Sequence, residues 1–334
     1  MKLNRWLVPV LLAAAAVLAG CKKESEKEYK SMDGGLSLSM PAYVLPGYTK
    51  TFDLDTLTTL SRADGGKIGY SFTNPDTGKP DTLVTADGTV RHKTYTVTAP
   101  DKLGTFTLRL SAFADPDSDY LGASESVSFT VVRPGVGSQS SITHFDLTPI
   151  SLTDSRDGRV YYTTQAGGHD WMRQNLAWEG AGMPYLDCPA MTDVFGRYYT
   201  WEEAQTACPE GWRLPTDADW VALAGGAEAG RDISGLAGKL MGDLYFNGTK
   251  MWEYWPAVKI TDETFLSVMP TGFATVGEGT GTFQGLYTYA AFWTADESEG
   301  LGVCRYIYHD KDILYRGRMS KTDFAASVRC VRKK

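Results

Sequence analysis

Four cysteines in the C-terminal half of this 334-residue chain are the side chains best able to form cross-links or bind a metal: Cys188, Cys208, Cys304 and Cys330. Zinc sites typically contain close C-x-x-C pairs. The nearest two of these cysteines, Cys188 and Cys208, lie 20 residues apart. In an exported chain, an even number of cysteines favours disulfides. The residues alone leave three pairings open.

Three carboxylates occupy alternate positions at Asp115, Asp117 and Asp119, as they do in loops that bind hard cations. An EF-hand needs glycine at the sixth position and glutamate at the twelfth. This chain has Tyr120 and Ser126 there. The pattern therefore predicts a looser Ca²⁺ site at most, and the alternative is a solvated loop rich in turn-forming residues.

Five aromatic residues in the expected long loops could stack on the apolar faces of sugar rings. They are Trp252, Tyr254, Trp255, Tyr287 and Tyr289. The alternative is that they build a small hydrophobic core beneath the loops. The sequence thus offers a hypothesis of glycan binding and leaves the exposure of these side chains open.

Motifs for catalysis are missing from the sequence. The four histidines lack the H-E-x-x-H spacing of zinc proteases, and no G-x-S-x-G or phosphate-binding glycine loop is present. The net charge of −7 argues against a nucleic-acid partner. We therefore expect a binding protein without enzymatic activity.

The first 20 residues resemble a bacterial lipoprotein signal peptide. Lys2 and Arg5 precede an apolar run too short to span a bilayer, and small residues precede Cys21. The resemblance implies cleavage before Cys21 and its acylation, which would hold the chain on the membrane. An ordinary signal peptide is the alternative. The charged residues 21–33 read as a tether, similar to the segment that directs Bacteroidetes lipoproteins to the outer-membrane exterior.

Residues 34–133 alternate apolar and small polar residues in short runs separated by turn formers, which predicts an all-β sandwich. The layout resembles PKD-like and Ig-like spacer modules of bacterial surface lipoproteins. Residues 134–146 have the composition of a linker. In the following domain, residues 147–334, Thr200 with Glu203 and Thr216 with Asp219 predict the capped starts of two short helices.

Ordered motifs in the C-terminal domain resemble the Fibrobacter succinogenes major paralogous domain. They include GHDWM at 168–172, GRYYTW at 196–201, ACPEGWRLP at 207–215, FWT at 292–294 and SVRCV at 327–331. That family is similar in its W-x-L-P segment to C-type-lectin-like folds and relatives of formylglycine-generating enzymes. The resemblance implies an α+β C-type-lectin-like fold behind the all-β sandwich.

The same resemblance implies a disulfide between Cys208 and Cys330, which leaves Cys188 to pair with Cys304. Cys304-Arg305 is similar to the copper-binding segment of formylglycine-generating oxidases, but the second nearby cysteine is missing. The preferred interpretation is a lipid-anchored protein facing the cell exterior that binds a glycan or a surface protein. The alternative is adhesion, as a pilus-tip or display component, and an oxidase is the more distant one.

Overall fold

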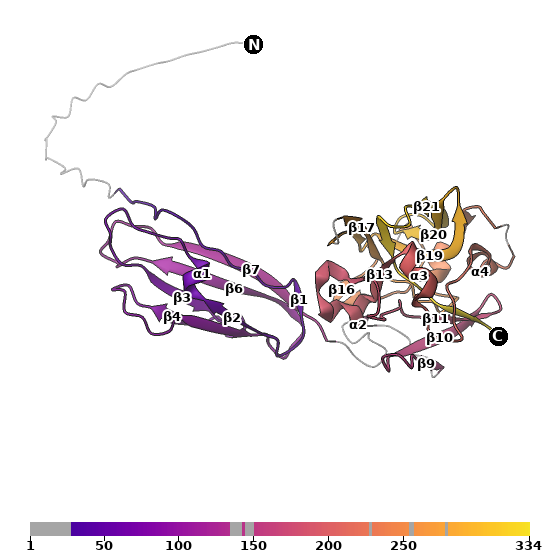
Figure 1. Cartoon of the computed structure of the whole chain (residues 1–334), viewed down its shortest axis with the longest axis horizontal. Coiled ribbons are helices and arrows are strands. Elements are labelled where there is room, and N and C mark those ends of the chain that lie inside the picture. Colours follow the sequence, from indigo (N-terminus) through magenta and orange to yellow (C-terminus); the bar gives the residue numbers. More distant parts are fainter. Residues whose placement is uncertain (1–27, 134–141, 144–149, 227–228, 254–256, 278–279) are drawn as a thin grey trace, which may run out of the picture.

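The computed structural model describes residues 28–133, 142–143, 150–226, 229–253, 257–277 and 280–334. Figure 1 shows two strand-rich bodies, an elongated N-terminal one and a rounder C-terminal one. Strands make up 44% of the structure and helices 11%. The molecule is therefore mostly β.

The N-terminal body contains a five-stranded sheet, in the order β1-β7-β6-β3-β4, and a separate β2-β5 pair. A short helix, α1 (Leu54–Leu57), follows β2. The strands are β1 (Tyr43–Val44), β2 (Thr49–Asp53), β3 (Gly69–Thr73), β4 (Pro80–Val84), β5 (Thr94–Thr98), β6 (Gly104–Phe113) and β7 (Ala123–Val131). Phe72 from the larger sheet stacks on Phe52 and Tyr95 from the pair, at ring-centroid distances of 5.6 and 4.3 Å. This shared core is compatible with the expected all-β sandwich.

The C-terminal body is built around a nine-stranded sheet in the order β12-β13-β22-β17-β19-β20-β21-β14, with β18 paired to β17. Two smaller sheets, β23-β11-β10-β9 and β16-β15-β8, accompany it. The strands are β8 (Ile142–Thr143), β9 (Ser151–Thr153), β10 (Val160–Ala166), β11 (His169–Met172), β12 (Met183–Pro184), β13 (Arg197–Thr200), β14 (Ile233–Ser234), β15 (Tyr245–Phe246), β16 (Thr249–Lys250), β17 (Thr271–Gly277), β18 (Thr280–Leu286), β19 (Tyr289–Ser298), β20 (Leu301–Tyr308), β21 (Ile313–Met319), β22 (Phe324–Ala326) and β23 (Val331–Lys333).

Both predicted helix starts are confirmed. The Thr200 hydroxyl accepts from the Glu203 N–H at 3.3 Å, and the Glu203 carboxylate accepts from the Thr200 N–H at 2.8 Å. Thr216 and Asp219 form the same reciprocal cap. The helices of the C-terminal body are α2 (Thr192–Phe195), α3 (Trp201–Ala207), α4 (Asp217–Ala222), α5 (Ala237–Leu240) and the 3-10 turns η1 (Tyr185–Asp187) and η2 (Pro189–Met191).

The expected α+β C-type-lectin-like fold is wrong, because these helices are too short to form a helical layer. The longest, α3, has seven residues. It ends at Ala207, and the next residue, Cys208, is extended with ψ of 145° because Pro209 disfavours helical backbone before it. Strands β19 and β20 are buried along most of both faces, so they lack the alternation that reveals a strand in sequence.

The C-terminal segment, residues 324–333, crosses the body and joins separate sheets. Strand β22 pairs with β13 and β17, and β23 pairs with β11. Between them, Cys330 forms a disulfide with Cys208, 122 residues earlier, and the two Cα atoms lie 5.8 Å apart. The pairing implied by the family resemblance is therefore confirmed.

The second expected disulfide is wrong, because Cys188 and Cys304 are both free and buried. They belong to different hydrophobic clusters. Cys188 packs with Met191 and Phe195, whereas Cys304 packs with Trp293 beneath β20. Each thiol thus fills space in its own core.

Buried guanidinium groups hold the irregular loop before β17. Arg329 donates to the Leu266 carbonyl at 2.6 Å and to the Asn175 side chain at 2.7 Å. Arg173 donates to the Phe265 carbonyl at 2.6 Å. The Asp262 carboxylate lies nearby and accepts from the Ser267 hydroxyl and N–H at 2.6 and 2.8 Å. These charged groups satisfy backbone carbonyls that no sheet pairs.

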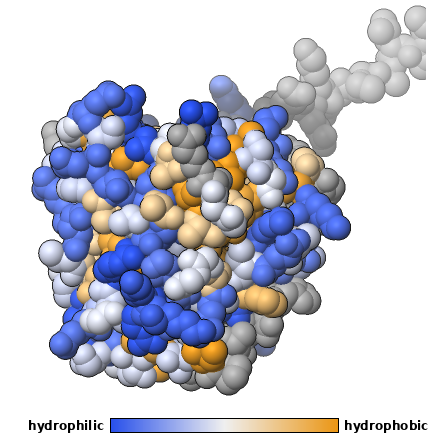
Figure 2. Space-filling view, turned by 90° about the vertical axis from the view of Figure 1, so that its right-hand side faces the viewer, coloured by the Kyte–Doolittle hydropathy of each residue, from blue (hydrophilic) through white to orange (hydrophobic). Residues whose placement is uncertain are grey.

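A hydrophobic joint connects the two bodies. It contains Val132 and Ile142 together with Phe246, and the Tyr43 ring of β1 packs on Tyr185 and Phe246 at 5.8 and 6.1 Å. Ile142 belongs to β8, so this part of the predicted linker is a strand, while residues 134–141 and 144–146 lie outside the described residues. The face of the molecule in Figure 2 is mostly hydrophilic around smaller hydrophobic areas.

We expect two alkylatable thiols in residues 22–334 when the chain is denatured without reductant. Cys188 and Cys304 should react, because only Cys208 and Cys330 are bonded. Mass spectrometry after iodoacetamide treatment measures the number. If no thiol reacts, Cys188 and Cys304 are bonded to each other and the prediction of two free thiols is wrong.

A pH dependence of stability follows from Asp262. Burial raises the pKa of this carboxyl to about 6, whereas an unfolded aspartate has a pKa of about 3.9. The native state therefore holds the proton more tightly between these values. The resulting stabilisation is present at low pH and is lost as pH rises through 6, by about 3 kcal/mol at most.

Urea unfolding of wild type and Asp262→Asn at pH 4 to 7 measures this effect. The wild type should lose stability relative to the variant as pH rises. A constant difference across this range would show that Asp262 titrates as it does in the unfolded chain.

Candidate functional site

The predicted aromatic loop residues do not form one open platform. Trp252 is only 1% exposed, and its indole N–H donates to the Val268 carbonyl at 3.0 Å. Tyr289 is 6% exposed, and Tyr287 is partly buried at the joint. Tyr254 and Trp255 lie outside the described residues. The predicted stacking of a sugar on Trp252 is therefore wrong, because the faces of the Trp252 ring pack in the core.

Tyr289 instead marks the buried edge of a larger group of tyrosines, which we call the tyrosine surface: Tyr289, Tyr306, Tyr308 and Tyr315. They come from β19, β20 and β21, which lie side by side in Figure 1. Tyr289 is paired with Tyr308, and Tyr306 with Tyr315. Because side chains two apart on a strand share a face, Tyr306 and Tyr308 point the same way.

The rings of the tyrosine surface pack against one another. Tyr306 and Tyr315 are stacked, with centroids 5.1 Å apart and an interplanar angle of 9°. Tyr308 meets both edge-on at 5.7 Å and is 43% exposed. Mutual packing of this kind stabilises rings beyond their burial, so the surface is ordered before any ligand arrives.

A close approach of the strands supports these rings from below. Gly317 on β21 lies opposite Cys304 on β20. A Cβ at Gly317 would come within 2.9 Å of the Tyr306 ring and 3.2 Å of the Cys304 sulfur. Glycine therefore leaves the space in which the Tyr306 ring sits over the buried thiol.

Cys304 is poorly suited to nucleophilic or redox chemistry. Burial raises the pKa of its thiol to about 12, and the thiolate is the reactive form. Its role in the structure is packing beneath the tyrosine surface.

The hydroxyl groups of the tyrosine surface are available to a ligand. In the described part of the chain, no hydrogen bond joins the hydroxyl of Tyr306, Tyr308 or Tyr315 to another residue. Burial raises the pKa of Tyr306 above its ordinary value. This hydroxyl is therefore neutral at physiological pH and can both donate and accept.

The arginines of β21 alternate with Tyr315 and therefore point to the opposite face of the sheet. Arg316 lies 3.5 Å from Asp217, and Arg318 pairs with Glu299. In the turn after β20, Lys311 lies 3.7 Å from Asp310. Near the rings, the Asp232 carboxylate is a negative charge that adds to burial in raising the pKa of Tyr306.

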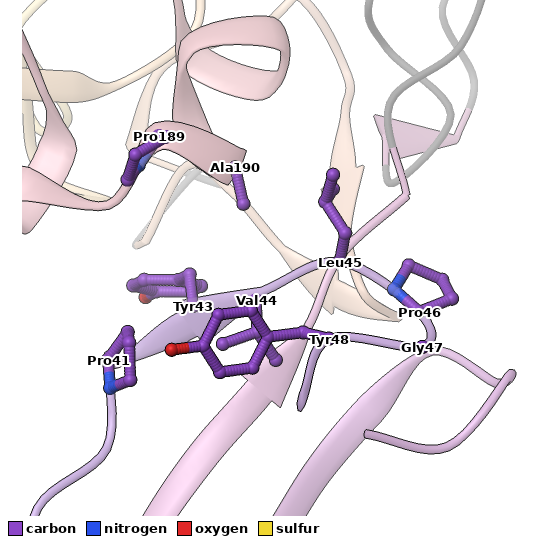
Figure 3. A pocket seen from close by; sticks show the side chains of 9 residues that line it. All are labelled: Pro41, Tyr43, Val44, Leu45, Pro46, Gly47, Tyr48, Pro189 and Ala190. Carbon is purple, nitrogen blue, oxygen red and sulfur yellow. The ribbon is translucent and has the colours of Figure 1, made fainter. Parts of the chain in front are cut away.

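A second concave feature lies at the joint (Figure 3). This groove has a volume of about 360 Å³. Its lining residues are mostly apolar and come from both bodies: Pro41, Tyr43, Val44, Leu45, Pro46, Gly47, Tyr48, Pro189 and Ala190. Among the described residues that line it, Tyr43 and Tyr48 supply the polar side-chain groups, their hydroxyls.

The predicted calcium ligands lie in the loop between β6 and β7. The Asp115 carboxylate accepts from the Asp117 N–H at 3.0 Å, and the Asp119 carbonyl accepts from the Lys30 N–H at 2.8 Å. Among the described residues, no three His, Cys, Asp or Glu side chains form a group that could hold a metal. Calcium binding stays a prediction from sequence.

The predicted lipidation site, Cys21, and the signal peptide lie outside the described residues. In the ranges that are described, no helix has the length and apolar character required to cross a membrane.

These features define a β-rich chain in two bodies whose C-terminal body carries a preorganised aromatic surface. Residues 164–332 match the Fibrobacter succinogenes major domain, and the chain belongs to this family. The match includes the whole tyrosine surface and the disulfide. Comparison with curated proteins and with solved structures gives no match.

The sequence analysis missed Tyr306, Tyr308 and Tyr315 as candidates. Tyr306-Ile-Tyr308 carries a recognisable signal, two aromatics at strand spacing. What the sequence lacks is the register that places Tyr315 beside Tyr306.

Truncation of one aromatic residue in the core and one on the tyrosine surface should lower the free energy of unfolding by different amounts. Trp252→Ala should lower the free energy of unfolding by about 3–5 kcal/mol, since it opens a cavity in the core. Tyr308→Ala should lower it by about 1 kcal/mol or less, because the side chain is partly exposed. Urea denaturation measures both, and equal losses would contradict the assignment of Tyr308 to the surface.

Proposed function

We propose that this chain is a lipid-anchored outer-surface protein that binds its ligand without catalysis, through the tyrosine surface of the family domain. The lipoprotein-like signal and Cys21 support the anchor. The absence of catalytic motifs from the sequence and the buried position of Cys304 support a binding role.

The arrangement of the sandwich supports display away from the membrane. Lys30 pairs with Tyr120 before β7 begins. The C-terminal body follows the opposite end of β7, where Val132 lies in the joint. The nine residues of β7 span about 30 Å. We infer that the sandwich acts as an Ig-like or PKD-like spacer.

One observation carries the binding role: three partly exposed tyrosines on paired strands present hydroxyls that have no hydrogen-bond partner among the described residues. Tyrosine provides apolar contact area and hydrogen bonds with little loss of conformational entropy. A glycan or a surface protein could use such a surface.

The groove favours the alternative, adhesion or display through protein contacts. Apolar residues from two bodies line it, and ligand sites often occur between domains. This alternative places the contact at Tyr43 and Tyr48 instead of on β20 and β21.

An array of glycans and bacterial or host surface proteins, probed with residues 22–334, tests the proposal. Tyr308→Ala/Tyr315→Ala should weaken binding at least tenfold, because it removes two of the exposed rings. Tyr48→Ala, a partly buried tyrosine of the groove, is the matched control and should bind as wild type. Loss in Tyr48→Ala alone would favour adhesion through the groove.

The full chain in its cell tests the anchor. Cys21→Ala should leave the membrane fraction, and external protease should digest the wild-type protein on intact cells. A wild-type chain that stays protected from external protease would contradict display.

A further inference from the structure

We infer that the ligand of the tyrosine surface is an uncharged oligosaccharide. This inference rests on the proposed binding function and narrows its ligand. It follows from the placement of the charged side chains, the hydroxyl groups and the size of the surface.

The placement of the charged side chains disfavours a ligand recognised by ionic contacts. Recognition of a carboxylate or sulfate uses cations that are free to form charge-assisted hydrogen bonds. On β21, Arg316 and Arg318 point to the face opposite Tyr315, where Asp217 and Glu299 engage them, and Lys311 in the turn after β20 pairs with Asp310. An anionic ligand on the tyrosine face would therefore lack both arginines and would meet the negative charge of Asp232 near Tyr306.

The hydroxyl groups favour a ligand that both donates and accepts hydrogen bonds. Each tyrosine hydroxyl is a donor and an acceptor, and the hydroxyls of Tyr306, Tyr308 and Tyr315 have no partner among the described residues. Sugar hydroxyls have the same dual character, and the C–H face of a pyranose complements an aromatic ring. An apolar ligand would leave these groups unpaired.

The size of the surface favours an oligosaccharide over a protein. Three adjacent strands span about 10 Å, which matches one or two sugar rings. A stable protein interface buries about 800 Å² on each partner and uses 20 to 30 residues a side. Four tyrosines, one of them only 6% exposed, provide far less.

Isothermal titration of residues 22–334 tests this inference with stated probes. The uncharged probes are cellohexaose, maltoheptaose, mannan and xylohexaose, and the anionic probes are polygalacturonate and chondroitin sulfate. We expect at least one uncharged probe to bind, with less than a twofold change in Kd between 50 and 500 mM NaCl. Tyr308→Ala/Tyr315→Ala should weaken this binding at least tenfold.

Matched variants distinguish the contribution of the Tyr308 ring from that of its hydroxyl, and a loss of binding from a loss of folding. Tyr308→Phe keeps the ring and should weaken binding less than Tyr308→Ala does. Tyr48→Ala should bind as wild type, and urea denaturation checks that each variant is folded.

The other outcomes overturn the inference in distinguishable ways. Binding of an anionic probe alone, or of a protein from the array alone, that is lost in the double variant overturns the uncharged ligand and leaves the proposed function standing. Binding that survives in the folded double variant overturns both. Failure of every uncharged probe to bind overturns the inference.

Discussion

The disulfide between Cys208 and Cys330 is the constraint on which the family domain depends, because it fixes a segment that belongs to several sheets at once. On one side of Cys330, β22 completes the sheet with β13 and β17; on the other, β23 pairs with β11. The disulfide joins residues 122 positions apart, and closing a loop of that length costs about 4 to 5 kcal/mol of chain entropy. Once it is closed, Arg329 reaches the loop before β17, and its carbonyls gain donors that strand pairing does not supply.

The hydrophobic joint holds the sandwich against the C-terminal body. Val132 and Ile142 are buried against Phe246, and the Asn247 side chain donates to the Val131 carbonyl at 3.2 Å. Apolar contact between domains of one chain limits their relative motion when it is well packed. The orientation of the sandwich is thereby coupled to that of the C-terminal body.

The sequence correctly predicted the features that depend on residues close together in the chain. The caps at Thr200 and Thr216 depend on residues three positions apart, and both are present. Pairings across the chain were harder. The expected α+β fold failed because strands buried on both faces resemble any apolar run, and Cys304 was assigned to a disulfide although its role is to fill a core. Tyr315 reaches Tyr306 only through the register of β20 and β21.

The form of the tyrosine surface sets how strongly it can bind. Preordered rings lose little entropy on binding, which favours affinity. However, a surface of four side chains offers few contacts, so a single site is expected to bind weakly. The proposed anchoring of many copies in one membrane would change this, because a polymeric ligand that leaves one site is held near the next and its effective local concentration rises. The proposed spacer would let neighbouring copies reach the same polymer. Weak, uncharged recognition and surface display therefore support each other: the first keeps each contact reversible, and the second makes the sum of contacts stable.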